Sequence, residues 1–342
     1  MSVDMASVRN VLMVRLSAIG DVVHTMPVAA ALKRSFPHIR LTWAVEDRCA
    51  ELVACNPYVD EVFPLPRHAW RTRRFRPTTW VTGSRRLMEL RTKHFDLALD
   101  LQGLLKSAVV AFASGAPVRL GYHWQREGAR FLVQGVPPPK EPTHVVQQYL
   151  DVVRYLGGKA ESVDFGLCIP DEAEASVQRL LEELGVSPPY AVINPSAGHA
   201  AKRWSPERFA AVCERLHAAG VVPVLVGHSM DAPLAAEIRA ACPVPVASAV
   251  GRTSLIELAA LIRDARLHMA GDTGSIHMAA ALGVPLVALY AATDPSRSGP
   301  FGCLDSVVSA YRAGGGGSIA DITVDAVWER TAQHLYPVTS GA

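Results

Sequence analysis

One aspartate, Asp21, lies at a position where its carboxylate could take part in a reaction. Asp21 follows Gly20 in "RLSAIGDVVHTMPVAAALKRSF", shortly after the apolar run VLMV, so it falls between an expected strand and an expected helix. One interpretation is a helix cap, because an aspartate at a helix N-terminus accepts backbone N–H bonds and complements the dipole. The other is an acid held at the carboxyl end of a strand, where α/β folds place their ligands. This stretch alone leaves both interpretations open.

A second stretch, "AGDTGSIHMAAALGVP" (Ala270–Pro285), predicts an anion site. A strand ends near Ala270 and a helix starts near Ser275, so the N–H groups of Gly274, Ser275 and Ile276 are expected to converge on one spot. The side chains around them fit a nucleotide sugar: Thr273 can donate through its hydroxyl, Asp272 can accept from sugar hydroxyls, and His277 can reach the same anion. The alternative is a capped helix with a buried histidine.

A third stretch, "NPSAGHAAKRWSPERF", places Lys202 on a glycine-containing loop that leaves a strand and precedes a helix. A lysine there is suited to neutralise a diphosphate. Neither a P-loop nor a G-x-G-x-x-G after a strand occurs, which argues against a P-loop enzyme and a dinucleotide oxidoreductase. A D-x-D pair is also missing, so cationic groups are expected in place of a metal. Asp231 follows another strand and could contact a nucleoside hydroxyl or cap a helix.

The charge distribution predicts an anionic partner for the first half of the chain. Residues 1–170 carry 22 Lys and Arg against 15 Asp and Glu, a balance of +7, whereas residues 171–342 carry 12 against 17, a balance of −5. Residues 67–94 hold nine of these cations and one acid, with tryptophan and phenylalanine between them. Such a segment suits phosphates or carboxylates, nucleic acid or a membrane interface. A merely solvated pair of helices is the alternative.

Elements that alternate between apolar strands and helices must position these residues. The alternation predicts βαβ units with parallel sheets and helices on both faces, an α/β doubly wound class. The pattern pauses near residue 165, so we expect domains at 1–165 and 166–322, followed by a last helix within 323–342 with Thr323 as its N-cap. Scattered cysteines and no signal-peptide pattern predict a reducing, cytoplasmic location, and the longest apolar run, residues 278–292, is too short to span a bilayer.

Five stretches in order resemble the lipopolysaccharide heptosyltransferases of glycosyltransferase family 9, most of all heptosyltransferase I. They are "SAIGDVVHTMP", "DLQGLLKSA", "KRW", "GDTGSIHMAAALGVP" and "TDP". The resemblance implies a GT-B fold, with two Rossmann-like domains facing across a cleft and a C-terminal helix crossing back to the first. It also implies an inverting, metal-independent enzyme without a cofactor, working peripherally at the cytoplasmic face of the inner membrane. "NPSAG" is closer to heptosyltransferase II.

The resemblance assigns roles to residues. Asp21 becomes the general base and Lys202 a second catalytic group. The expected donor site for ADP-heptose comprises Lys202, Asp231, Asp272, Thr273, Gly274, Ser275 and His277. The expected acceptor site for Kdo-bearing lipid A comprises Ser17, Gly20, His24, Arg71, Arg73, Arg74 and Lys106. Nucleic acid is not an expected partner.

Three other functions remain open at this point. The same fold and donor could serve another acceptor, namely a heptosylated core, a protein or a small natural product. A non-catalytic binder of anionic lipid or nucleic acid would keep the fold without turnover, although it has no need of Asp21, Lys202 and the Gly-Asp-Thr-Gly turn together. A nucleotide-sugar epimerase would need no basic acceptor region.

Overall fold

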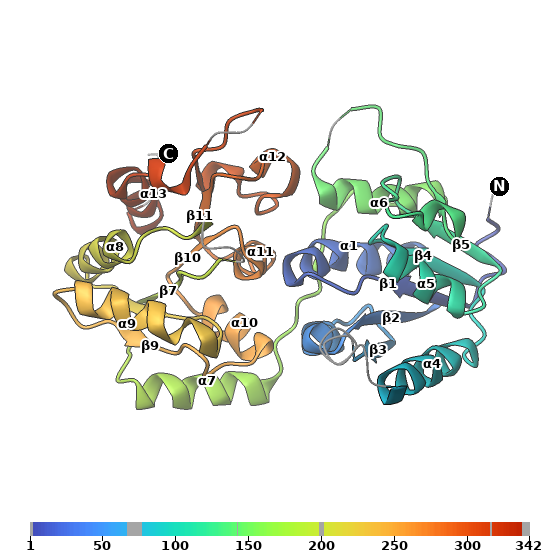
Figure 1. Ribbon diagram of the computed structural model, residues 1–342, viewed down its shortest axis with the longest axis horizontal. Helices are drawn as coiled ribbons and strands as arrows, with labels where there is room; N and C mark the ends of the chain where they lie inside the picture. The colour runs from blue at the N-terminus through green and yellow to red at the C-terminus, as the bar shows by residue number, and fades with distance from the viewer. Residues whose placement is uncertain (1–2, 67–76, 142, 198–201, 315–316, 337–342) are drawn as a thin grey trace. The chain divides into compact units, whose positions relative to one another are not determined.

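The computed structural model describes residues 3–66, 77–141, 143–197, 202–314 and 317–336. The chain divides into two compact units, Met1–Cys168 and Ile169–Ala342, called here the first and the second unit. The division lies three residues after the boundary that the break in the strand–helix pattern suggested. Figure 1 shows strands and helices in each unit.

The first unit is built on a parallel sheet. Within the described residues its strands are β1 (Asn10–Val14), β2 (Arg40–Glu46), β3 (Glu61–Leu65), β4 (Leu97–Asp100), β5 (Val118–Gly121) and β6 (Gln134–Gly135). Their order in the sheet is β3-β2-β1-β4-β5-β6, and every pair is parallel. Because helices must return the chain between parallel strands, both faces of the sheet become buried.

Helices cover both faces of this sheet. They are α1 (Ile19–Ser35), η1 (Asp47–Cys49), α2 (Ala50–Ala54), α4 (Pro77–Arg91), α5 (Leu105–Ala113), η2 (Ala129–Phe131) and α6 (Val145–Tyr155). Helix α1 packs against α6, while α5 packs against α4, η2, β1 and β4. Most of α1 is apolar and buried, and it carries Asp21 in its first turn and basic Lys33 and Arg34 in its last, which complements the helix dipole.

The second unit repeats this plan. Within the described residues its strands are β7 (Tyr190–Asn194), β8 (Val222–Leu225), β9 (Ala247–Ser248), β10 (Leu267–Gly271), β11 (Leu286–Tyr290) and β12 (Val307–Ser309). The sheet order is β12-β11-β10-β7-β8-β9, again parallel throughout. Its helices are α7 (Asp171–Glu183), α8 (Pro206–Ala218), η4 (Ser229–Asp231), α9 (Ala232–Ala241), α10 (Leu255–Arg263), α11 (Gly274–Ala281), α12 (Pro295–Ser298), η5 (Leu304–Ser306), η6 (Ile319–Asp321) and α13 (Val324–Leu335).

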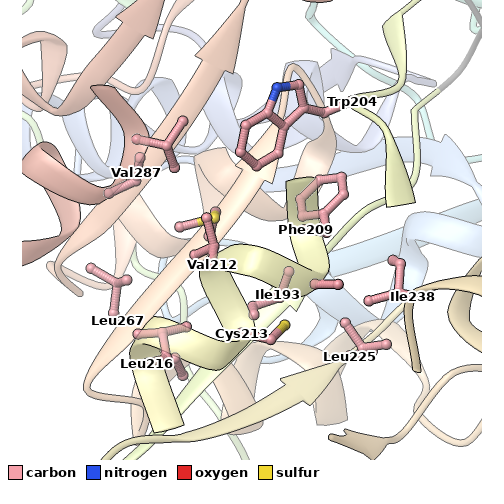
Figure 2. Packing of buried hydrophobic residues seen from close by; sticks show 14 of the residues in the cluster. Ile193, Trp204, Phe209, Val212, Cys213, Leu216, Leu225, Ile238, Leu267 and Val287 are labelled. Carbon is pink, nitrogen blue, oxygen red and sulfur yellow. The ribbon is translucent and has the colours of Figure 1, made fainter. Parts of the chain in front are cut away.

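Alternate strand residues of the second unit enter two cores. Ile193, Leu267 and Val287 face α8, where Trp204 and Phe209 pack edge to face with their ring centroids 5.1 Å apart (Figure 2). Val192 and Ala270 face the opposite side, toward α7, α10 and α11. This alternation follows from the period of two in a strand. The doubly wound α/β class predicted from the sequence is thus found in each unit.

The last described helix, α13, belongs to the second unit. Val327 and Leu335 are buried in the same core as Trp204, and α13 packs on α8 and β11. The return of residues 323–342 to the first domain stays a prediction. The apolar positions of α13 form one stripe that matches the second unit's own surface. Ala326 donates its N–H to Thr323 Oγ1 at 3.2 Å, which confirms the predicted cap. Residues 337–342 lie outside the described residues.

Each sheet has one point where the strand order reverses. In the first unit it lies between β1 and β4, and in the second between β7 and β10. Loops that leave neighbouring strands in opposite directions open a crevice there, the usual ligand site of such sheets. Asp21 and Lys106, at the starts of α1 and α5, flank the first point, and the loops carrying Lys202 and Asp272 flank the second. None of the described helices is long and apolar enough to cross a membrane.

Candidate active site

Asp21 caps its helix and still keeps an accessible carboxylate. Its Oδ2 accepts the N–H of Ala18 at 3.2 Å, which caps the start of α1, and it pairs with Arg15 Nη2 at 2.7 Å. Both contacts use the same oxygen, and the side chain stays 45% exposed. The cap therefore holds the carboxylate in place while leaving an accessible face, as a general base needs.

Arg15 lies buried beneath this carboxylate. Its guanidinium donates to the Leu101 carbonyl and stands 5.1 Å from the centroid of the Tyr149 ring. Burial works to lower the pKa of Arg15, but the charges of Tyr149 and Asp21 outweigh it, so the pKa is raised. Arg15 is therefore a permanent cation that fixes the direction of Asp21. In the sequence, the position of Arg15 directly after an apolar strand could have indicated this role.

The loop after β4 holds the loop after β1. Gln102 accepts the Leu16 N–H at 3.1 Å through Oε1 and donates to the Ser17 carbonyl at 3.2 Å through Nε2. Asp100 fixes this loop in turn, because its Oδ1 accepts the N–H of Gln102 at 2.9 Å and of Gly103 at 3.1 Å. Burial raises the pKa of Asp100. The "DLQG" segment is thus a scaffold for the loop between β1 and α1, a role that its motif did not reveal.

The expected acceptor residues fall into three groups. Lys106 donates to Ser17 Oγ at 3.5 Å, so these two come together beside the Asp21 loop. Gly20 is buried in α1. His24 is buried too, and its ring meets that of His144, the N-cap of α6, edge-on with the centroids 5.3 Å apart, so it faces the start of a neighbouring helix. Arg71, Arg73 and Arg74 lie outside the described residues.

A triangle of polar side chains forms in the second unit. Lys202 Nζ lies 3.0 Å from Asp272 Oδ2 and 3.2 Å from Thr293 Oγ1, and Thr293 donates to the same Asp272 oxygen at 2.7 Å. The three residues line a small pocket with Leu289, Ala291 and Ile319. Thr293 follows β11, the neighbour of β10, and it begins the "TDP" segment. The sequence analysis placed Thr293 in a family motif but gave it no role in the site, although its place after a parallel strand could have suggested one.

Opposing effects set the charge of Asp272. Burial works to raise its pKa, but the hydrogen bonds from Thr293 and Lys202 outweigh burial and lower it, with a smaller contribution from His277. Asp272 is therefore an anion that already holds the lysine. His277 itself is buried in the first turn of α11.

Ser275 is the centre of a buried hydrogen-bond chain below this pocket. Asn194 Nδ2 donates to Ser275 Oγ at 3.1 Å, and His268 Nε2 and Thr273 Oγ1 each lie 3.1 Å from that oxygen. His268 Nδ1 lies 3.1 Å from the Val192 carbonyl, which can only accept. Burial lowers the pKa of His268 to about 3, so the ring is neutral and carries its proton on Nδ1.

These contacts fix which way each hydroxyl points. Since His268 Nε2 has no proton, Ser275 must donate to it, and Thr273 must then donate to Ser275. The outer side of the Thr273 oxygen therefore offers lone pairs. We expected a hydroxyl donor for phosphate here; the geometry instead makes Thr273 an acceptor, suited to a sugar hydroxyl. The Ser275 side chain is also internal, which leaves its backbone N–H to face a ligand.

Two further residues expected in the donor site, Ile276 and Asp231, already make hydrogen bonds within the protein. Ile276 donates its N–H to the Thr273 carbonyl at 3.3 Å, so it is engaged within its own turn. Asp231 accepts from Ser196 Oγ at 2.9 Å and from the His228 N–H at 2.9 Å, and so ties two loops at the strand ends. Among the described residues, no group of three or more His, Cys, Asp and Glu side chains could hold a metal ion.

Comparison with known proteins identifies the family of the chain. The profile of glycosyltransferase family 9 (heptosyltransferase) matches residues 85–314. Lipopolysaccharide heptosyltransferase 1 of Pseudomonas aeruginosa is 31% identical over 305 residues, which cover 86% of this chain and 81% of that protein.

Two solved structures share the fold. A family 9 glycosyl transferase from Veillonella parvula has a TM-score of 0.83 and 20% identity, with 98% of each chain covered. The Escherichia coli heptosyltransferase WaaC with ADP-2-deoxy-2-fluoro heptose has a TM-score of 0.75 and 23% identity, covering 95% of this chain and 99% of that one. The GT-B fold and the family predicted from the motifs are confirmed. The chain belongs to glycosyltransferase family 9, the heptosyltransferases, and is a glycosyltransferase.

Proposed function

We propose that the protein transfers heptose from ADP-heptose to a Kdo-bearing lipid A acceptor in lipopolysaccharide inner-core synthesis. The observation that carries this proposal is the exposed Asp21 carboxylate, held by a buried arginine at the switch point of the first sheet. The heptosyltransferase 1 relative supports the reaction, and the ADP-2-deoxy-2-fluoro heptose bound by the Escherichia coli enzyme supports the donor.

In the proposed reaction, Asp21 takes the proton from an acceptor hydroxyl as its oxygen attacks the anomeric carbon of heptose. The new glycosidic bond forms on the face opposite the bond that breaks, so the configuration inverts. ADP leaves with the electrons of the broken bond, and Asp21 later passes its proton to water. A carboxylate is a weak base for a sugar hydroxyl, so the fixed position that Arg15 imposes supplies much of the rate.

The leaving diphosphate is assigned to the second unit. Lys202 leaves its ion pair with Asp272 and binds the diphosphate oxygens instead. The N–H groups of Gly274 and Ser275 at the start of α11 add to the positive potential around the diphosphate. We assign this charge stabilisation to protein groups and propose that no metal ion takes part. Asp272 and the Thr273 lone pairs are then available to heptose hydroxyls, and His277 completes the site. Asp231 is proposed at the nucleoside, through the loop that it fixes.

The acceptor is assigned to the first unit. Lys106 and Ser17 stand beside Asp21 and suit a Kdo carboxylate, while Gly20 and His24 shape α1 behind them. The proposal extends the site to Arg71, Arg73 and Arg74 for the remaining acidic groups. We also propose that the enzyme works in the cytoplasm, peripherally at the inner membrane, because its acceptor is a lipid.

A coupled assay tests this function. ADP release is measured with ADP-heptose and Kdo-lipid A, together and singly, and the acceptor is weighed by mass spectrometry. The proposal predicts ADP release that needs both substrates and an acceptor heavier by one heptose. ADP release without a heavier acceptor, or transfer only to an already heptosylated core, would refute the proposed acceptor.

A further inference from the structure

Helix α5 is apolar on both of its faces. Ser107, Ala108, Val110 and Ala111 are buried against the sheet, as expected for a helix that covers β1 and β4 (Figure 1). The opposite face carries Leu105, Val109 and Phe112, and all three are exposed. Their spacing of four and three residues puts them on one stripe. Single exposed apolar residues are ordinary, but an outward stripe marks a surface that meets another apolar phase.

The stripe continues onto the neighbouring turn. Helix η2 packs on α5 and ends in Phe131, whose side chain is 79% exposed. Arg119 links the two, because its guanidinium lies 5.3 Å from the centroid of the Phe112 ring and it lines a surface hollow with Phe131 and Arg130. Leu105, Val109, Phe112 and Phe131 with Arg119 and Arg130 are called here the α5 patch.

Positive charge surrounds these apolar side chains. Residues 104–135 contain four basic residues, Lys106, Arg119, Arg126 and Arg130, against a single acid, Glu127. Arg130 lies 5.2 Å from the centroid of its neighbour Phe131, and Arg126 lies 5.1 Å from that of Trp124. Aromatic rings flanked by arginines suit the boundary between acyl chains and anionic headgroups, where each ring is half immersed and each cation meets a phosphate.

We propose that the α5 patch docks on the surface of an anionic lipid bilayer. The same helix points Lys106 at Ser17, beside Asp21. A bilayer against the patch therefore lies next to the residues assigned to the acceptor. The reason for docking rests on the proposed function, in which the acceptor is a membrane lipid, whereas the patch itself rests on the exposed side chains and their charges.

Vesicle flotation with the full chain and no substrate tests this. One set of vesicles contains equal parts of phosphatidylglycerol and phosphatidylcholine, and the other contains phosphatidylcholine alone. The wild type is expected to float with the anionic vesicles and to lose most of this binding in high salt. Phe112→Ser with Phe131→Ser should weaken binding about tenfold or more, and Arg130→Gln about fivefold.

Matched controls come from the second unit. Leu304→Ser removes an exposed leucine and Arg239→Gln an exposed arginine, and both should bind vesicles like the wild type. Equal flotation of the Phe112/Phe131 variant and the wild type, or no flotation of the wild type, would overturn the proposal. So would a wild-type dimer that this variant dissociates, because the patch would then bind a second copy.

A second readout keeps this inference separate from the proposed function. Turnover is measured with acceptor dispersed in detergent and again with acceptor embedded in anionic vesicles. The patch variant should match the wild type in detergent and fall about tenfold on vesicles. If the protein floats but transfers no heptose in either form, the proposed function fails and the docking surface stands.

Discussion

The two units share a sheet order and a switch point, yet their ion pairs are exposed in opposite ways. In the first unit the cation is buried and the acid is accessible to solvent: the side chains of Arg15 and Asp21 are 5% and 45% exposed. In the second unit the exposures are more even, with Lys202 at 32% and Asp272 at 23%. A buried guanidinium cannot leave its acid, whereas an accessible lysine can exchange one anion for another. The same fold thus supports a fixed, accessible carboxylate in one unit and an accessible cation in the other.

Removing the proposed base should give the largest effect on turnover. Asp21→Asn keeps a side-chain oxygen for the Ala18 N–H but cannot accept a proton, so turnover should fall about 10³-fold. Initial rates of ADP release measure this, with circular dichroism to confirm folding. A rate within tenfold of the wild type would mean that another group is the base.

Removing the exchangeable cation should come next. Lys202→Met leaves Asp272 paired with Thr293 but deletes the charge proposed for the diphosphate, and kcat/KM should fall about 10²-fold. Thr293→Val is the matched control, because it removes the hydroxyl that donates to Asp272 but removes no charge, and it should cost only about tenfold. Equal losses in the two variants would show that the charge of Lys202 is not what matters.

The buried chain below the second site predicts acid sensitivity. His268 has a pKa of about 3 when folded, against about 6.5 in an unfolded chain. The unfolded state therefore binds the proton first, and stability falls as the pH drops below 6.5, by about 2 kcal/mol at pH 5. His268→Gln keeps a donor and an acceptor but does not titrate. Urea unfolding at pH 6.5 and 5 should show a smaller loss in this variant, and an equal loss would exclude His268 as the cause.

Changing the buried cation should lower the rate less than removing Asp21 or Lys202. Arg15→Lys keeps a charge but has no fork to reach both Asp21 and the Leu101 carbonyl, so turnover should fall about tenfold. Donor affinity should stay the same, because this residue positions the base and lies in the other unit. A loss of ADP binding in a folded Arg15→Lys protein would contradict the assignment of the nucleotide to the second unit.

The fold and the positions of the charged residues could be predicted where local residue patterns mark strand ends and helix starts. Alternating strands and helices, the Gly-Asp turns and Lys202 all led to the ends of parallel strands, because strand ends and helix starts have strong local signals. Arg15, Gln102 and Thr293 act through partners on other strands, and no local pattern shows such pairing. The direction of the Thr273 hydroxyl depends on His268, five residues earlier on the buried side of β10, which only the folded chain reveals.

The path of the last helix could not be read from its own residues. The stripe of Val327 and Leu335 requires an apolar surface but does not say which unit offers it. Trp204 and α8 supply that surface in the second unit, and Trp204 Nε1 also donates to the Ile322 carbonyl at 2.9 Å, just before α13. The periodicity of a helix shows that it has an apolar face but does not identify the surface on which that face packs.

Titration of ADP into Asp21→Asn and Lys202→Met, side by side with the wild type, tests the division of labour most directly. Calorimetry should give wild-type affinity for Asp21→Asn and affinity at least about tenfold weaker for Lys202→Met. Weakened ADP binding in Asp21→Asn together with unchanged binding in Lys202→Met would contradict the account, because the first unit would then hold the nucleotide.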